Sequence, residues 1–137
     1  MLDPQFPEAG EVCVKNVMLV GLGGFVGSVF RYLVAIAIPF TAGGFPYATL
    51  AVNLVGSFII GFVSELAIST TMISPETRLL LTTGFCGGLT TFSTAMYETM
   101  ALGRDAQALY AGLYVAGSLL GGLLFIFSGT LCAKLWQ

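Results

Sequence analysis

Apolar residues run through most of this chain in four long blocks, which are separated by short polar breaks. A helix of roughly 20 apolar residues crosses about 30 Å of hydrocarbon, and each block is long enough to do so. The pattern therefore predicts an all-α membrane protein with four transmembrane helices in one domain, residues 17–137, after a polar tail of residues 1–16. The predicted spans are residues 17–40, 47–68, 78–102 and 106–135.

The breaks between the blocks contain residues that form turns. Gly43 and Gly44 lie between the first and second blocks. Ser74, Pro75 and Glu76 precede the third block, and this order is typical of the beginning of a helix because proline is tolerated in the first turn.

Composition agrees with lipid as the solvent, because 56% of the residues are hydrophobic and only 9% are charged. Soluble domains usually carry about 25% charged residues. The chain has no histidine, and its three cysteines are widely spaced. Zinc catalysis and Ser-His or Cys-His chemistry are therefore improbable, and we expect no enzyme. No basic stretch indicates binding of nucleic acid.

The basic residues give almost no preference for one orientation in the membrane. With four spans, Lys15, Arg78 and Lys134 share one side, whereas Arg104 lies on the other side with Arg31 near that end of the first helix. So weak a bias is compatible with insertion in both orientations, although short loops also give weak biases by chance. Small residues at four-residue spacing, which let helices approach closely, favour an oligomer.

The third block contains a run of glycines and hydroxyl residues, Gly84–Thr94, inside an otherwise apolar segment. Lipid offers no hydrogen bonds, so polar backbone at this depth must be satisfied by protein, water or an ion. The run predicts that the third helix is broken at mid-membrane, where transporters and channels tend to hold ions.

Polar residues in the first two blocks allow more than one interpretation. Arg31 lies well inside the first block, where arginine costs about 2.5–3.5 kcal/mol unless it reaches an interface or faces water. It either extends to the interface or lines an aqueous entrance that attracts anions. In the second block, Thr49, Asn53 and Ser57 share one helical face. They either join helices or offer neutral donors to a moving solute.

The later blocks carry similar polar faces. Tyr110, Tyr114 and Ser118 follow at four-residue spacing in the fourth block, and Thr94 and Glu98 are four residues apart in the third. Glu98 is either a proton-coupling group or a hydrogen-bonded, protonated carboxyl. Such faces on several helices, without a nucleophile and its base, indicate a lined pathway rather than a catalytic centre.

Three motifs together resemble the Fluc (CrcB) fluoride channels of microbes. They fall in order on the first three blocks, and the resemblance covers the whole chain apart from the N-terminal tail. The motifs are GFVGSVFRY at Gly24–Tyr32, NLVGSF at Asn53–Phe58 and GFCGGLTTFST at Gly84–Thr94.

The resemblance implies a fluoride-selective channel that passively exports fluoride across the cell membrane of a microbe and so relieves its toxicity. It implies an antiparallel, dual-topology homodimer in the lipid bilayer, with two fluoride pathways. It also implies a structural Na+ at the centre of the dimer, held by the backbone carbonyls of Gly87 and Thr90.

The resemblance further assigns residues to the fluoride pathway. Phe92 matches a phenylalanine whose ring edge, the positive part of its quadrupole, faces the anion. Ala95 stands where the family has a second phenylalanine, which puts a complete aromatic box in doubt. The full set of expected pathway residues is Arg31, Asn53, Phe92, Ser93, Thr94, Tyr114 and Ser118.

The main alternative is a small proton-coupled multidrug exporter, which also has four spans. Such exporters bind cations at a membrane glutamate in the first helix, whereas the first block here has Arg31 and no acidic residue. A membrane assembly factor without transport activity is a third class, but it would need neither aligned polar faces nor a broken third helix.

Overall fold

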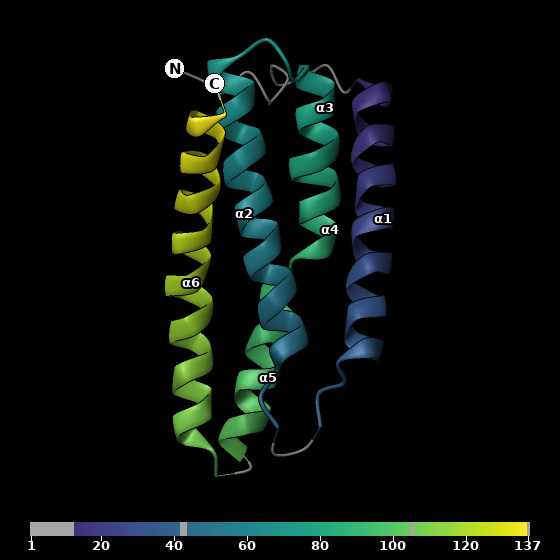
Figure 1. Cartoon of the computed structure of the whole chain (residues 1–137). Coiled ribbons are helices and arrows are strands. Elements are labelled where there is room, and N and C mark those ends of the chain that lie inside the picture. The colour runs from purple at the N-terminus through teal and green to yellow at the C-terminus, as the bar shows by residue number, and fades with distance from the viewer. Residues whose placement is uncertain (1–12, 42–43, 105, 137) are drawn as a thin grey trace.

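All the elements in the described part of the chain, residues 13–41, 44–104 and 106–136 of a computed structural model, are helices. They run lengthwise in one elongated bundle, with the start of α1 and the end of α6 at the same end (Figure 1). The elements are α1 (Val14–Ala37), α2 (Tyr47–Ser69), α3 (Pro75–Leu79), η1 (Leu80–Cys86), α4 (Gly87–Leu89), α5 (Phe92–Arg104) and α6 (Ala108–Leu135).

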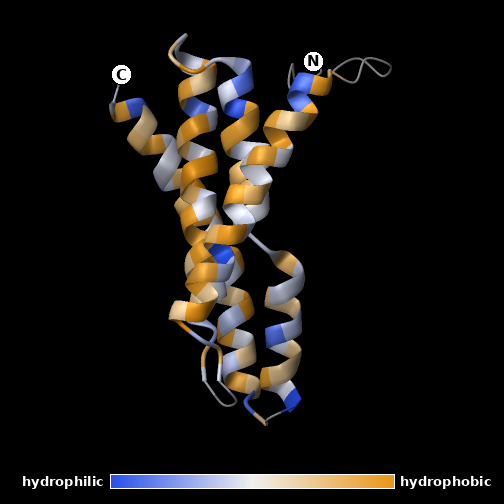
Figure 2. Cartoon of the chain, turned by 90° about the vertical axis from the view of Figure 1, so that its right-hand side faces the viewer, coloured by the Kyte–Doolittle hydropathy of each residue, from blue (hydrophilic) through white to orange (hydrophobic). Residues whose placement is uncertain are grey.

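Three of these helices, α1, α2 and α6, are long and apolar enough to cross a membrane. Most of their residues are hydrophobic (Figure 2), and many of the large ones are exposed. The prediction of an all-helical protein with membrane-spanning helices is thereby confirmed. The third apolar block instead forms the interrupted path from α3 through η1 and α4 to α5.

The first helix lies about one turn earlier in the chain than the predicted span. It begins at Val14, inside the stretch predicted as a tail, and it ends at Ala37, before Pro39. Proline disfavours helical geometry in the residue before it, so the helix cannot continue to Phe40 as predicted. Most of the predicted tail, residues 1–12, lies outside the described residues.

The third block begins as its sequence predicts. Ser74 caps α3, because its Oγ accepts a hydrogen bond of 3.1 Å from the backbone N–H of Thr77, and Pro75 occupies the first turn. The helical path then continues through the π-helical η1 to Leu89 and stops at Thr90 and Thr91. The interruption lies near the middle of the bundle, and α5 is displaced sideways from α4 (Figures 1 and 2).

Gly84 and Gly88 of the third block lie inside helices, where they pack closely against α1. A methyl group on Gly27 would clash with the carbonyl oxygen of Phe85, and one on Gly88 would clash with that of Gly24. The same kind of contact joins α2 and α6, where Gly61 faces the backbone of Ile126. These small-residue faces bring backbones into direct contact, as expected for helices packed in lipid.

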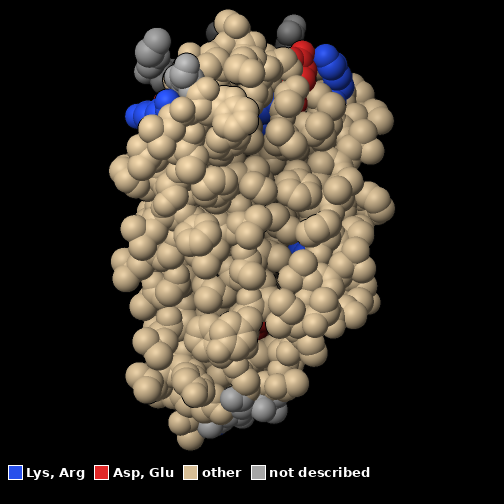
Figure 3. All heavy atoms as spheres, viewed as in Figure 1, with Lys and Arg blue, Asp and Glu red and all other residues tan. Residues whose placement is uncertain are grey.

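Charged side chains gather at the end of the bundle where α1 begins and α6 ends (Figure 3). Lys15 of α1 lies 3.1 Å from Glu76 of α3, and Lys134 of α6 lies 4.0 Å from Glu65 of α2. The backbone N–H of Glu76 itself, and then Lys15, lower the pKa of the Glu76 carboxyl. The two ion pairs link each outer helix to an inner one at this end.

Gly27→Ala should lower stability by about 1–3 kcal/mol, the usual cost of overpacking, because the added methyl group meets the Phe85 carbonyl oxygen. Thermal unfolding of the detergent-solubilised protein measures this. Gly21→Ala on the same helix is the matched control, because nothing lies within 4 Å of the position its methyl group would take. Equal unfolding temperatures for both variants would contradict the backbone contact.

Candidate functional site

A pocket of about 420 Å³ lies beside the interruption, between α2, α5 and α6. Its wall is mostly apolar, but a few polar groups converge on it. These groups are Asn53 and Ser57 from α2, Thr90 and Thr91 from the interruption, and Ser118 from α6, with the ring of Phe92 beside them. An apolar pocket with a few placed polar groups is the usual form of a binding site for a small solute.

The side chain of Asn53 forms hydrogen bonds with backbone groups that the interruption leaves unpaired. Its Nδ2 donates to the carbonyl oxygen of Thr91 at 3.0 Å, and its Oδ1 accepts from the N–H of Thr91 at 2.7 Å. The side-chain amide thus pairs with one residue as a neighbouring backbone would. Because an asparagine amide has two N–H donors, one remains for a ligand in the pocket.

Thr91 also caps the second half of the broken helix. Its Oγ1 accepts a hydrogen bond of 3.2 Å from the N–H of Thr94 and lies 3.0 Å from the Thr94 hydroxyl. This is the N-cap geometry that satisfies an orphan donor at the start of a helix. The hydroxyls of Ser93 and Thr94 therefore gather around Thr91 rather than line the pocket.

Among the described residues that line the pocket, Ser118 has the one buried side-chain polar atom without a hydrogen-bond partner. Its Oγ is buried and makes no hydrogen bond to any described residue. In contrast, the hydroxyl of Ser57 donates to the carbonyl of Asn53 at 2.7 Å and is thereby occupied. A buried hydroxyl without a partner costs free energy, so Ser118 is suited to bind something that enters the pocket.

Phe92 is 72% exposed, although it is a large apolar residue beside a polar interruption. Ala95, one turn later, is 3% exposed and packs with Leu102 and Tyr114. Ala95 also lines the pocket, where its small side chain leaves space. In this chain, Phe92 alone presents an aromatic ring to the pocket.

Arg31 does not line this pocket. It extends from α1 to the first half of the broken helix, where its Nε donates to the carbonyl oxygen of Gly88 at 3.1 Å. The side chain is half-buried, and among the described residues it forms no ion pair. The sequence suggests that Arg31 reaches the interface or lines an aqueous entrance, and neither interpretation predicts its hydrogen bond to Gly88.

Several carbonyl groups at the end of the first half of the broken helix lack a donor. The oxygens of Gly87, Leu89 and Thr90 accept no hydrogen bond from another described residue, whereas those of Cys86, Gly88 and Thr91 do. Gly87 is exposed, and nothing lies within 4 Å of the position of an added Cβ. The described part of the chain has no cluster of acidic, cysteine or histidine side chains that could hold a metal.

A second polar cluster, Thr49, Glu98 and Tyr114, joins α2, α5 and α6. The Thr49 hydroxyl donates to Glu98 Oε1 at 2.7 Å, and the Tyr114 hydroxyl donates to Oε2 at 2.6 Å. All three residues are buried, and Tyr114 is 0% exposed. Sequence analysis noted each residue but missed the cluster, because the partners are 49 and 16 residues away from Glu98.

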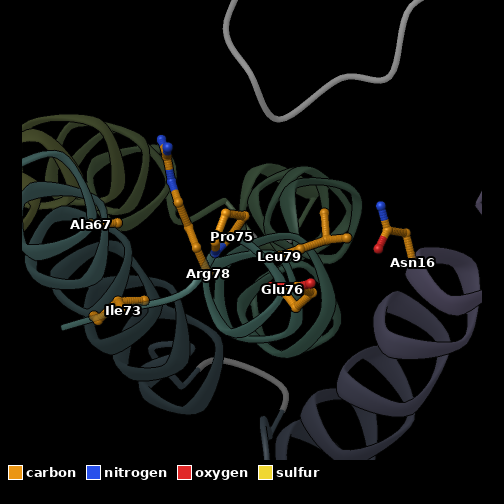
Figure 4. A pocket seen from close by; sticks show the side chains of 7 residues that line it. All are labelled: Asn16, Ala67, Ile73, Pro75, Glu76, Arg78 and Leu79. Atoms are coloured by element: carbon orange, nitrogen blue, oxygen red, sulfur yellow. The ribbon is translucent and has the colours of Figure 1, made fainter. Parts of the chain in front are cut away.

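A smaller pocket of about 240 Å³ lies near the start of α1 and of α3. Asn16 of α1 and Ala67 of α2 lie on opposite sides of α3, which contributes Glu76 and Arg78 (Figure 4). None of the expected pathway residues lines this pocket, and it is separate from the interruption.

Residues 18–130 match the family described as "CrcB-like protein, Camphor Resistance (CrcB)". A protein of Chlorobaculum tepidum named "Fluoride-specific ion channel FluC" is 75% identical over 124 residues, which are 90% of this chain and 98% of that protein. Proteins with the same name are similar in Chlorobium phaeobacteroides strain BS1 (57% identity, 88% and 94% covered) and in Methanococcus aeolicus (43%, 85% and 93%).

Tyr114→Phe should destabilise the protein by about 1–3 kcal/mol, because it leaves a buried oxygen of Glu98 without a donor. Tyr110→Phe, one turn earlier on α6, is the matched control, since Tyr110 is 45% exposed. Thermal unfolding of both variants and of Thr49→Val provides the comparison. We expect the effects of Tyr114→Phe and Thr49→Val to be non-additive, and strict additivity would show that the two hydroxyls do not share one carboxylate.

Proposed function

The chain belongs to the CrcB family, and we propose on this basis that it is a fluoride-selective ion channel of a microbial cell membrane. The observation that carries the proposal is the 75% identity to a named fluoride channel over nearly the full length of both chains. The apolar helices α1, α2 and α6 place the protein in the membrane. As a channel, it transports rather than catalyses, and fluoride leaves the cell down its own gradient.

The pocket beside the interruption is the proposed fluoride pathway. Fluoride is small and strongly hydrated, so a pathway must replace its water with close hydrogen-bond donors, each weak enough for the ion to leave. The remaining N–H of Asn53 and the unpartnered hydroxyl of Ser118 are neutral donors of this kind. The exposed ring of Phe92 offers its positive edge at the same place.

The other expected pathway residues form contacts within the protein instead of lining the pocket. Tyr114 is bonded to Glu98, and Arg31 to Gly88. Ser93 and Thr94 surround the cap of α5. None of these four lines the pocket of this single chain. Their direct contact with fluoride remains a prediction of the resemblance.

We also propose that the interrupted path from α3 to α5 is the fourth crossing and that two copies pair antiparallel. An even number of crossings agrees with α1 beginning and α6 ending at the same end of the bundle (Figure 1). Within the proposed spans, α1 and α6 bury few of their residues, and Phe92 is exposed beside the pathway. A second copy would cover part of these faces.

A structural Na+ at the centre of that dimer is the third part of the proposal. The carbonyls of Gly87 and Thr90 fit such a site, because they are backbone oxygens at a helix interruption without donors among the described residues. Unwound backbone carbonyls are known ligands of Na+ in membrane proteins. The ion would stabilise the partial negative charge of these oxygens in each copy.

Liposomes that contain the purified protein should lose fluoride rapidly and retain chloride, as a fluoride electrode and a chloride electrode would record. Asn53→Ala and Phe92→Ile should reduce fluoride flux roughly tenfold or more, which corresponds to ~1.4 kcal/mol. Phe127→Ile is the matched control, because Phe127 is exposed on α6 outside the pocket. Full flux in both pathway variants would place the pathway elsewhere, and retention of fluoride by the wild type would refute the channel.

Dual topology predicts that Cys13, which is exposed at the start of α1, faces both sides of the membrane. In a Cys132→Ser variant, an impermeant maleimide applied to intact cells should label about half of Cys13, and permeabilisation should expose the rest. A variant that also carries Cys13→Ser is the control, since the remaining Cys86 is buried. Complete or absent labelling before permeabilisation would establish a single orientation.

A further inference from the structure

Two helix ends of opposite polarity face each other at the interruption. The first half ends at Leu89, and its last carbonyls carry the partial negative charge of a helix C-terminus. The second half begins at Phe92, and its first N–H groups carry the partial positive charge. An anion that passes through the pocket beside Thr90 and Thr91 is close to both ends.

The two helix ends differ in the partners that the rest of the chain provides for their backbone groups. At the start of α5, Thr91 Oγ1 satisfies the N–H of Thr94, while the N–H groups of Phe92 and Ser93 have no acceptor among the described residues. At the end of α4, the carbonyl of Gly88 accepts from Arg31 Nε at 3.1 Å. The positive end is thus left open, whereas the negative end meets a cation.

The position of Arg31 is fixed by packing rather than by chance extension of a long side chain. Gly24, Gly27 and Arg31 share one face of α1, and both glycines lie directly against η1 and α4. A methyl group at Gly27 would clash with the Phe85 carbonyl, and one at Gly88 would clash with the Gly24 carbonyl. The close contact therefore holds the arginine beside the carbonyl end of the first half-helix.

We propose that Arg31 is a positioning residue that acts through the Gly88 carbonyl: its charge cancels the negative end of α4, so that an anion beside the interruption meets the positive end of α5. The inference rests on the proposed fluoride function and adds a cause for anion preference in a pathway lined by neutral groups. It differs from attraction at an aqueous entrance, because a half-buried charge fixed on a carbonyl acts at short range.

Salt separates these two roles. A charge at an aqueous entrance is screened over about 8 Å at physiological ionic strength, whereas a half-buried charge in direct contact is screened much less. An entrance residue would therefore matter at low salt and cease to matter at high salt. A residue that compensates the partial charge of a helix end should affect fluoride flux equally at low and high salt.

The test compares fluoride flux from liposomes for the wild type, Arg31→Gln and Arg31→Lys at low and high ionic strength. Arg31→Gln should reduce the maximal flux roughly three- to thirtyfold, the range of a charge effect at a helix end, equally at both ionic strengths. Arg31→Lys keeps the charge and should recover most of the flux. Arg104→Gln is the matched control, because it removes one charge in the last turn of α5, and any effect should vanish at high salt.

Several results would overturn the role of Arg31. These are wild-type flux in Arg31→Gln, a defect that disappears at high salt, or a folded Arg31→Lys protein that is as impaired as Arg31→Gln. Protection of the buried Cys86 from thiol reagents identifies folded variants, and if Arg31→Gln is unfolded, the flux of Arg31→Lys decides. A wild type that retains fluoride would refute the channel itself, whereas a conducting wild type with an unaffected Arg31→Gln would refute this role alone.

Discussion

An interrupted helix within a bilayer leaves backbone groups that lipid cannot satisfy, and this constraint explains the placement of most polar residues here. Asn53 forms hydrogen bonds with both backbone groups of Thr91, and Arg31 donates a hydrogen bond to the carbonyl oxygen of Gly88. The groups left over, among them the Gly87 carbonyl and the hydroxyl of Ser118, are the ones to which we propose that ions bind. Structure and proposed transport thus derive from the same unpaired groups.

Much of the fold follows from local sequence signals. Apolar blocks of about 20 residues predict the long helices, and Ser74 with Pro75 predicts the start of α3. The run Gly84–Thr94 predicts a break in the third helix, and the interruption at Thr90 and Thr91 lies within this run. Gly84 and Gly88 remain helical because α1 packs against them at backbone distance, so tertiary contact overrides their low helix propensity. At the interruption, Asn53 supplies the missing partner of the Thr91 backbone.

The site was less predictable than the fold, because its key contacts join distant residues. Spacing alone places Asn53 and Ser118 on polar helical faces, and the structure brings both to one pocket. Residue spacing cannot show that Arg31 reaches Gly88, 57 residues away, or that Glu98 accepts hydrogen bonds from Thr49 and Tyr114. Such pairs depend on which helices are neighbours, and periodicity within a single helix carries no information on that.

The buried carboxyl of Glu98 also imposes an order on the assembly of the chain during synthesis. Thr49 precedes it and Tyr114 follows it, so the second donor leaves the ribosome only after α5 is complete. The carboxyl of Glu98 therefore has both of its donors only after α6 has been made and packed, and the last helix completes the burial of the one before it.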